Sequence, residues 1–214
     1  LQERAPVFNE TIRSGLQIRT YLDFPENWGL GSSSTLISCL AQSTGINPFE
    51  LLDATMGGSG YDIACAQARG PLLYEKPSFV NIPFRPSFHR QLYFVHLGHK
   101  QNSREGIARY RAAGRAPQKL IDSISKLSLA LAAAETQQHF DRILIEHENL
   151  VSKYLGLTRA QELYFPDFEG TIKSLGAWGG DFVLASAQSS TNQTYQYFKE
   201  KGYSTILPWE QICR

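Results

Sequence analysis

Apolar and polar positions follow two rhythms that are interleaved along the chain. A period-two alternation, typical of a half-buried strand, runs from Leu16 to Leu22. From Ser34 to Gly45 apolar residues recur at the three- and four-residue intervals of one helix face. The same patterns predict strands at 71–74, 91–97 and 203–207, a glycine-rich turn flanked by strands within 172–187, and helices at 49–54, 62–68, 103–111, 117–134, 135–155 and 191–201. Interleaved strands and helices in both halves predict an α+β fold of two layered subdomains.

A proline-bearing segment at 78–88, with Pro83 and Pro86, is the best candidate for a linker. It separates an N-terminal domain, 1–88, from a C-terminal domain, 89–214. The sequence opens at Leu1 without an initiator methionine or a signal-peptide pattern, so we expect the natural protein to begin earlier.

Composition narrows the possible partners. The 214 residues carry a net charge of +1, which gives no argument for binding nucleic acid or an acidic membrane surface. No apolar run approaches the roughly 18 residues that span a bilayer. Three cysteines, Cys39, Cys65 and Cys213, show no metal-ligand or redox spacing and indicate reduced thiols in a cytoplasmic protein. We expect a monomer or a homodimer.

The first chemical motif is Pro-Glu-Asn-Trp-Gly-Leu-Gly-Ser-Ser-Ser-Thr, from Pro25 to Thr35, between a predicted strand and an amphipathic helix. Glycines let the backbone approach a ligand closely, and the first amides of a helix lack intrahelical partners. Together with the helix dipole they form a phosphate cradle. The alternative is an ordinary helix cap after a glycine turn. The motif is not a Walker P-loop, because no Gly-Lys-Ser/Thr follows.

The second motif, Gly-Gly-Ser-Gly-Tyr-Asp-Ile-Ala, runs from Gly57 to Ala64. Its carboxylate, Asp62, follows a glycine turn and opens a helix of small residues. Such a group can accept or orient the proton of an attacking hydroxyl. The alternative is a capping role, because aspartate is a favoured residue at helix N-termini.

The third motif runs from Lys173 to Ala185 and contains Lys-Ser-Leu-Gly-Ala-Trp-Gly-Gly-Asp. Its glycine-rich turn can lie beneath the phosphates of a nucleotide and brace the first loop, or it can be a hairpin with a glycine bulge. A separate basic turn around Lys100, Ser103 and Arg104 suits a carboxylate or phosphate of a substrate, and its alternative is a solvated helix cap.

In this order the three motifs resemble those of the GHMP kinases, which include galactokinase, homoserine kinase, mevalonate kinase and phosphomevalonate kinase. Pro25–Ser33 matches the family pattern Pro-x-x-x-Gly-Leu-Gly-Ser-Ser in full, and Gly58–Ala64 is similar to the Gly-Ser-Gly-x-Asp-x-Ala of phosphomevalonate kinases. The string Gly-Tyr-Asp-Ile-Ala at Gly60–Ala64 resembles a bacterial subgroup. The third motif departs from the family pattern, with Leu175 inserted and Trp178 in place of a glycine.

The resemblance implies a two-subdomain GHMP kinase fold, with a ribosomal-protein-like N-terminal part and a ferredoxin-like C-terminal part. Nothing before Gln17 matches the family's first strands, so the N-terminal part is expected to be truncated. The implied cofactors are ATP and Mg²⁺. The implied phosphate-binding residues are Gly29, Leu30, Gly31, Ser32, Ser33, Ser34, Gly176, Gly179 and Gly180.

For chemistry, the resemblance implies Asp62 as the catalytic residue and Ser33 as a metal ligand. Lys100, Ser103, Arg104 and Lys173 are the candidate substrate-binding residues. An acidic metal ligand is not assigned, because neither Glu50 nor Asp53 has a convincing spacing.

The implied function is ATP-dependent transfer of the γ-phosphate to a small acidic metabolite, most simply mevalonate or phosphomevalonate. Two alternatives remain open at this stage. One is a catalytically silent nucleotide-binding protein of the same fold, and the other is a mevalonate diphosphate decarboxylase.

Overall fold

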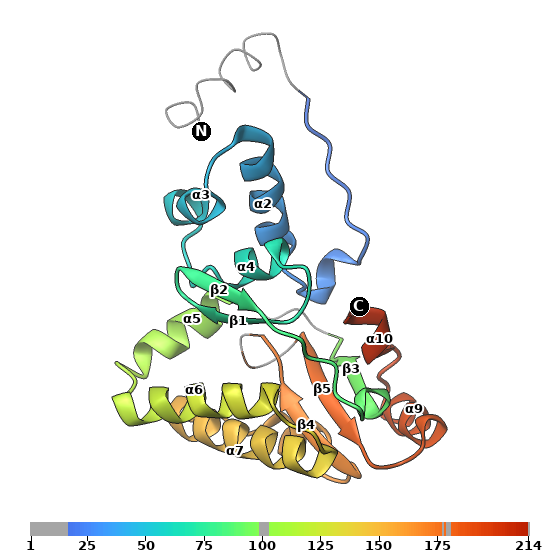
Figure 1. Ribbon diagram of the computed structural model, residues 1–214. Coiled ribbons are helices and arrows are strands. Elements are labelled where there is room, and N and C mark those ends of the chain that lie inside the picture. Colours follow the sequence, from blue (N-terminus) through green and yellow to red (C-terminus); the bar gives the residue numbers. More distant parts are fainter. Residues whose placement is uncertain (1–16, 99–102, 177, 179–180, 214) are drawn as a thin grey trace. The chain divides into compact units, whose positions relative to one another are not determined.

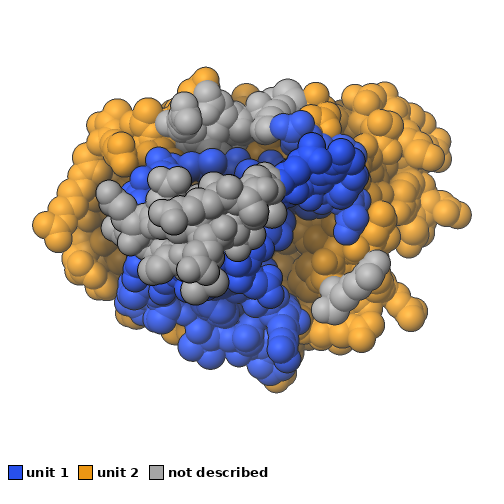
Figure 2. All heavy atoms as spheres, turned by 90° about the horizontal axis from the view of Figure 1, so that it is seen from above, with its two compact units in different colours: residues 1–26, 30–83 blue, residues 27–29, 84–214 orange. Residues whose placement is uncertain are grey.

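The structure is a computed structural model, and it describes residues 17–98, 103–176, 178 and 181–213. These residues divide into two compact units, coloured separately in Figure 2. Unit 1 comprises the described residues up to Glu26 together with Leu30–Pro83. Unit 2 comprises Asn27–Gly29 and the described residues from Phe84 onward. The first glycine motif is therefore shared, because its residues 27–29 belong to unit 2 and its continuation from Leu30 belongs to unit 1.

Unit 1 consists of three helices and a hairpin: α2 (Ser32–Thr44), α3 (Pro48–Thr55), α4 (Tyr61–Gln67), β1 (Leu72–Glu75) and β2 (Ser78–Asn81). The Asn47 side chain caps α3 by accepting hydrogen bonds from the amides of Phe49 and Glu50, and Pro48 occupies the first turn, where its missing N–H costs nothing. One face of each helix is buried in a common core of Ile37, Ala41, Ile46, Leu51, Leu52 and Ile63.

Unit 2 is built on a four-stranded antiparallel sheet of β3 (Leu92–His96), β4 (Gly170–Ser174), β5 (Phe182–Ala187) and β6 (Ile206–Pro208). The spatial order is β4-β5-β3-β6, and all three pairings are antiparallel. Helices separate β3 from β4 and β5 from β6, whereas β4 and β5 follow each other directly. This is the ferredoxin-like arrangement, and it confirms the fold expected for the C-terminal part.

The helices of unit 2 include α7, which packs against β4, and α6, which lies beside α7 (Figure 1). Their bounds are η2 (His89–Gln91), α5 (Ser103–Ala112), α6 (Gln118–Ala132), α7 (Gln137–Leu155), α8 (Ala160–Tyr164), α9 (Thr191–Glu200) and α10 (Trp209–Ile212), with η2 a 3₁₀ helix. All six residues of β5 are buried, with Val183 and Ala185 in one apolar cluster and Leu184 in another. Because successive strand side chains face opposite ways, β5 is covered on both faces.

Two expectations from the sequence are wrong. Residues 17–22 form no strand, and Ile18 and Tyr21 are 50% and 84% exposed. Their alternation satisfies the pattern, but a strand also needs a hydrogen-bonding neighbour, and the described residues provide none there. The segment 78–88 is not wholly a linker, since Ser78–Asn81 pairs with β1 as β2. The prolines Pro83 and Pro86 follow this strand, where they interrupt no hydrogen bond of the hairpin.

Within the described part of the chain, none of the helices combines the length and the apolar character needed to cross a bilayer.

Candidate active site

The first motif folds as a 3₁₀ turn, η1 (Glu26–Trp28), followed by the glycine bend and helix α2. Gly29 and Gly31 have φ values of 66° and 77°, a left-handed conformation that glycine adopts without strain. Gly31 is the N-cap of α2, and no side chain caps this end of the helix. Thr35 closes the first turn, with its amide and its hydroxyl both donating to the Gly31 carbonyl at 2.9 and 3.1 Å.

Three consecutive amides at the start of α2, those of Ser32, Ser33 and Ser34, donate to no acceptor in the described chain. They point out of the N-terminus of a 13-residue helix, where the peptide dipoles add partial positive charge. Unpaired amides and serine hydroxyls at this position suit the oxygens of a phosphate. The residues Gly31 to Ser34, predicted from the sequence to bind phosphate, thus form a helix N-terminus of the kind that suits an anion.

The second motif lies beside the first within unit 1. A Cβ added to Gly31 would stand 3.9 Å from the Cβ of Asp62, which is in the first turn of α4. A side chain at position 31 would therefore narrow the space between the helix N-terminus and the carboxylate. The structure brings Gly31 and Asp62 together across 31 positions of sequence.

The environment of Asp62 modifies its acidity. Although the side chain is exposed to solvent, the surrounding protein removes enough water to raise the pKa of its carboxyl above the ordinary 3.8. A hydrogen bond with the Tyr61 side chain acts in the opposite direction and is the smaller effect. Burial, reinforced by the charge of Asp62, raises the pKa of Tyr61 to about 12. A carboxylate with a raised pKa is a better proton acceptor than an ordinary aspartate.

Residues 27–29 are attached to unit 2 at the ends of β3 and β5. The Trp28 ring meets Phe182 edge-on, with centroids 5.7 Å apart, and lies 6.4 Å from the ring of His96. His96 Nε2 is 3.3 Å from the backbone oxygen of Asn27. This contact joins the start of the first motif to the end of β3.

A close approach completes this attachment. A Cβ built on Gly29 would lie 2.3 to 2.5 Å from the carboxylate atoms of Asp181. A side chain at position 29 would have to displace this carboxylate and would also have to adopt the left-handed conformation, so two separate effects favour glycine here. Nothing in the sequence predicted this approach of Asp181 to Gly29, apart from the place of Asp181 in the third motif.

The third motif forms the connection between β4 and β5. Gly176 has a φ of 62°, and Trp178 has a φ of 54° and is 9% exposed. A left-handed conformation at a buried tryptophan is strained by about 1–3 kcal/mol and persists because the surrounding structure holds it. Gly179 and Gly180, predicted to support the phosphates, lie outside the described residues.

Lys173, predicted from the sequence as a substrate-binding residue, makes its described contacts inside unit 2. Its ammonium is 3.3 Å from Oε1 of Glu148 on α7 and donates to the Ser174 carbonyl at 3.0 Å, and its side chain is 15% exposed. Ser174 Oγ donates to the other carboxylate oxygen of Glu148 at 3.2 Å. Burial lowers the pKa of Lys173, and Glu148 opposes that shift. The structure thus shows this lysine fixing β4 to α7 inside unit 2.

The remaining predicted substrate residues cannot be placed. Lys100 lies outside the described residues, and Ser103 and Arg104 open α5 with side chains that the structure does not describe.

Of the two acids considered as metal ligands, Asp53 is paired with Lys76 at 3.3 Å. The described residues contain no cluster of three or more His, Cys, Asp or Glu side chains suited to a metal ion.

The residues of unit 1 nevertheless offer what a nucleotide-bound Mg²⁺ requires. Such an ion keeps several waters and takes few protein ligands besides the phosphates. The hydroxyls of Ser32 and Ser33 and the carboxylate of Asp62 supply oxygen donors on α2 and α4. An all-protein metal cage is therefore not needed at this site.

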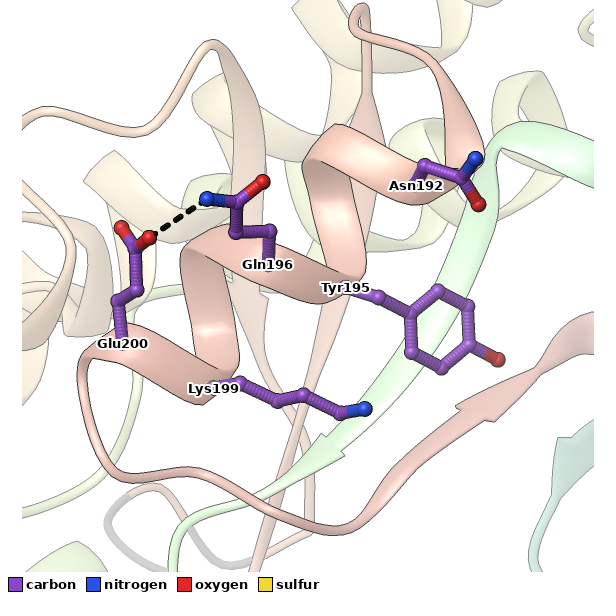
Figure 3. A pocket seen from close by; sticks show the side chains of 5 residues that line it. All are labelled: Asn192, Tyr195, Gln196, Lys199 and Glu200. Carbon is purple, nitrogen blue, oxygen red and sulfur yellow. Dashed lines mark hydrogen bonds between the residues drawn. The ribbon is translucent and has the colours of Figure 1, made fainter.

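A surface hollow elsewhere does not compete with this site. It runs along α9, and Figure 3 shows that its lining side chains, Asn192, Tyr195, Gln196, Lys199 and Glu200, all come from that helix. Two of them, Gln196 and Glu200, are hydrogen-bonded to each other at 2.7 Å. Side chains from a single helix face do not converge on a ligand as binding sites do.

No protein-family model and no curated protein matches the sequence. Solved structures do match. A Lin0012 protein from Listeria innocua superposes with a TM-score of 0.63 at 16% identity, covering 85% of this chain and 66% of that one. The L. major mevalonate kinase, solved in complex with R-mevalonate, superposes with a TM-score of 0.59 at 17% identity, covering 85% and 65%. The chain has a GHMP-kinase-like fold.

At these identities the likeness concerns the fold alone. The chain spans about two thirds of the length of both structures. The GHMP-kinase-like fold agrees with the α+β architecture and the ferredoxin-like sheet described above.

Sequence reasoning missed several residues that hold the motifs in place. Tyr74 and Lys76 of the β1–β2 hairpin bind the turn of the second motif, and His96 contacts the first motif. The sequence gives little indication of these contacts, because each side chain contacts a backbone carbonyl, and every residue has a backbone carbonyl whatever its type.

Proposed function

We propose that this protein is an ATP-dependent kinase that transfers the γ-phosphate of ATP to a hydroxyl or phosphate oxygen of a small acidic metabolite. The observation that carries the proposal is the position of Asp62 next to the N-terminus of α2, where three amides donate to no acceptor among the described residues. A phosphate site and a carboxylate with a raised pKa on the same side of two packed helices are the two parts that phosphoryl transfer requires.

In the proposed mechanism the amides of Ser32, Ser33 and Ser34 bind and orient the phosphate oxygens of ATP. Asp62 accepts the proton of the attacking hydroxyl, or orients an acceptor that is already ionised. Bound Mg²⁺ supplies positive charge that neutralises the transferring phosphate, and the Ser33 hydroxyl is the proposed protein ligand. Because phosphoryl transfer involves little covalent chemistry by the protein, the rate depends on this positioning.

Mevalonate or phosphomevalonate is the proposed acceptor. Two lines support this choice: the Gly-Ser-Gly-Tyr-Asp-Ile-Ala string at Gly58–Ala64, and the structural likeness to a mevalonate kinase solved with R-mevalonate. The side chains proposed to bind the acidic group of the acceptor are the cations of Lys100 and Arg104 and the hydroxyl of Ser103. Lys173 is left out of this set, since its charge is already engaged by Glu148.

The test is ADP release by the full-length protein with mevalonate, phosphomevalonate, homoserine and galactose. In the Asp62→Asn variant we expect kcat to fall about 10²-fold or more, because the proton acceptor is lost. ATP binding measured by calorimetry should remain, since the amides of α2 are untouched. The matched control is Asp122→Asn, an exposed acid on α6, which should leave kcat unchanged.

The same assay separates the alternatives. If ATP binds but no acceptor is phosphorylated, the protein is a silent nucleotide binder. If mevalonate diphosphate releases CO₂ in the presence of ATP, it is a decarboxylase. An Asp62→Asn variant that transfers phosphate as fast as the wild type would remove Asp62 from the mechanism.

A further inference from the structure

The turn that precedes Asp62 is rich in glycine, so its own residues do little to fix its conformation. Three of its four residues, Gly57, Gly58 and Gly60, have positive φ values of 65°, 116° and 81°. Glycine reaches these values without strain, but it also has the widest choice of other conformations and loses the most entropy when fixed. A carboxylate carried by such a turn is well placed only if contacts from outside hold the turn.

Those contacts come from the β1–β2 hairpin of unit 1. The Tyr74 hydroxyl donates a 2.6 Å hydrogen bond to the carbonyl of Ser59. The Lys76 ammonium donates to the carbonyl of Gly58 at 3.3 Å and is also 3.3 Å from Oδ1 of Asp53 on α3. Two successive carbonyls of the turn, those of Gly58 and Ser59, therefore accept hydrogen bonds from Lys76 and Tyr74. Strand β1, which carries Tyr74, also packs against α4 (Figure 1).

The same hydroxyl also lies close to Gly60, the residue that precedes α4. A Cβ added to the buried Gly60 would lie 2.9 Å from the Tyr74 oxygen and 3.0 Å from the Phe49 ring. Gly60 is the N-cap of α4, and Asp62 is in the first turn of that helix. Tyr74 thus contacts the turn at its carbonyl and at the residue that starts the helix.

The two supports are not equal. The Lys76–Asp53 pair is exposed on both sides, with 48% and 56% of the side chains accessible, and exposed ion pairs contribute little. Tyr74 is partly buried, and its hydrogen bond is short. The tyrosine is the principal support of the turn.

We propose that Tyr74 is a positioning residue for Asp62, acting through the Ser59 carbonyl to hold the carboxylate beside the N-terminus of α2, with Lys76 as a second support. The inference rests on the proposed function and extends it, because it names groups that do not touch the substrate. Misplacing a reacting group by about 1 Å can cost up to 10²-fold in rate, so a loosened turn should be visible in kcat.

The test is Tyr74→Phe in the full-length protein, which removes one hydroxyl and keeps the ring. We expect kcat to fall about ten-fold while KM for ATP stays unchanged, because the loss is confined to the transition state. Hydrogen exchange of the amides at 57–62 should accelerate. The matched control is Tyr154→Phe, whose hydroxyl donates to the Gly114 carbonyl at 2.7 Å within unit 2, and it should change neither readout.

A double-mutant cycle distinguishes positioning from general damage. In an Asp62→Asn background, Tyr74→Phe should reduce the residual rate no further, since the group that it positions is gone. Equal losses in both backgrounds, or faster exchange with an unchanged kcat, would overturn the inference. A wild-type protein that phosphorylates none of the acceptors refutes the proposed function, whereas an active wild type with an unaffected Tyr74→Phe refutes only this role.

Discussion

At the scale of single residues, Gly29 and Gly45 have nearly the same backbone conformation but different surroundings. Their φ values are 66° and 69°, yet a Cβ on Gly29 would collide with Asp181, while one on Gly45 would meet nothing within 4 Å. Gly45→Ala should therefore cost only the left-handed strain, about 1 kcal/mol of unfolding free energy. Gly29→Ala should cost about 3 kcal/mol, because overpacking is added to the strain.

Urea unfolding of the two variants measures this difference. Adding Asp181→Ala to the Gly29→Ala variant should recover part of the loss, because the colliding carboxylate is removed. Equal costs for the two glycine substitutions would show that the carboxylate does not lie against the bend. The comparison is informative because Gly45→Ala adds only the strain of the left-handed backbone, whereas Gly29→Ala adds the collision with Asp181 as well.

The scale of single residues also shows which features of the candidate site could be predicted from the sequence. The start of α2 after Gly31 and the start of α4 near Asp62 could be predicted because both follow from local backbone chemistry, namely left-handed glycines that precede a helix. The contacts of Trp28 and Tyr74 could not, since they join segments far apart in the chain and end on aromatic rings or on carbonyls. Such contacts depend on tertiary structure, and a single sequence does not encode them as a pattern.

At the scale of elements, helix α7 contains a histidine that is poorly placed to carry charge. His147 Nδ1 is buried and has no hydrogen-bond partner among the described residues. Burial, together with the nearby Lys173 ammonium, lowers the pKa of His147 to about 4. Because the folded state binds this proton more weakly than the unfolded state, stability is lost as pH falls from about 6.5 towards 4. The contribution is at most about 3 kcal/mol, and less where solvent screens the ring.

Replacing His147 by leucine removes this titration. The unfolding free energy of the variant should fall less than that of the wild type between pH 6.5 and pH 4, as measured by urea unfolding at several pH values. The exposed His139→Leu on the same helix is the control and should follow the wild type. A wild-type stability that does not change across this range would contradict a neutral buried His147.

Elements also explain the two errors of the sequence analysis. Residues 17–22 and β2 both have strand-like patterns, but only β2 has a neighbouring strand, with Leu73 opposite Val80. Periodicity describes which side chains can be buried and does not supply the hydrogen-bonding partner. Helices make their backbone bonds internally, which is why the long patterns that became α6 and α7 were reliable.

At the scale of the whole molecule, the two units differ, within the described residues, in the size of their sheets and of their apolar cores. Unit 2 has a four-stranded sheet and two apolar clusters, whereas the core of unit 1 is one cluster under a two-stranded hairpin. A hairpin of two strands is marginally stable by itself, while a sheet covered on both faces can fold as an independent domain.

We therefore expect a fragment of residues 84–214 to fold alone, with a cooperative urea transition and a slope of about 1–3 kcal/mol per molar. Without Trp28, the aromatic face of Phe182 and His96 loses its cover, so the fragment should be less stable than unit 2 in the full chain. Trp28→Ala in the full chain should reproduce that loss. A fragment with helical circular dichroism but no cooperative transition would show that the sheet and helices of unit 2 depend on residues of unit 1 as well as on residues 27–29.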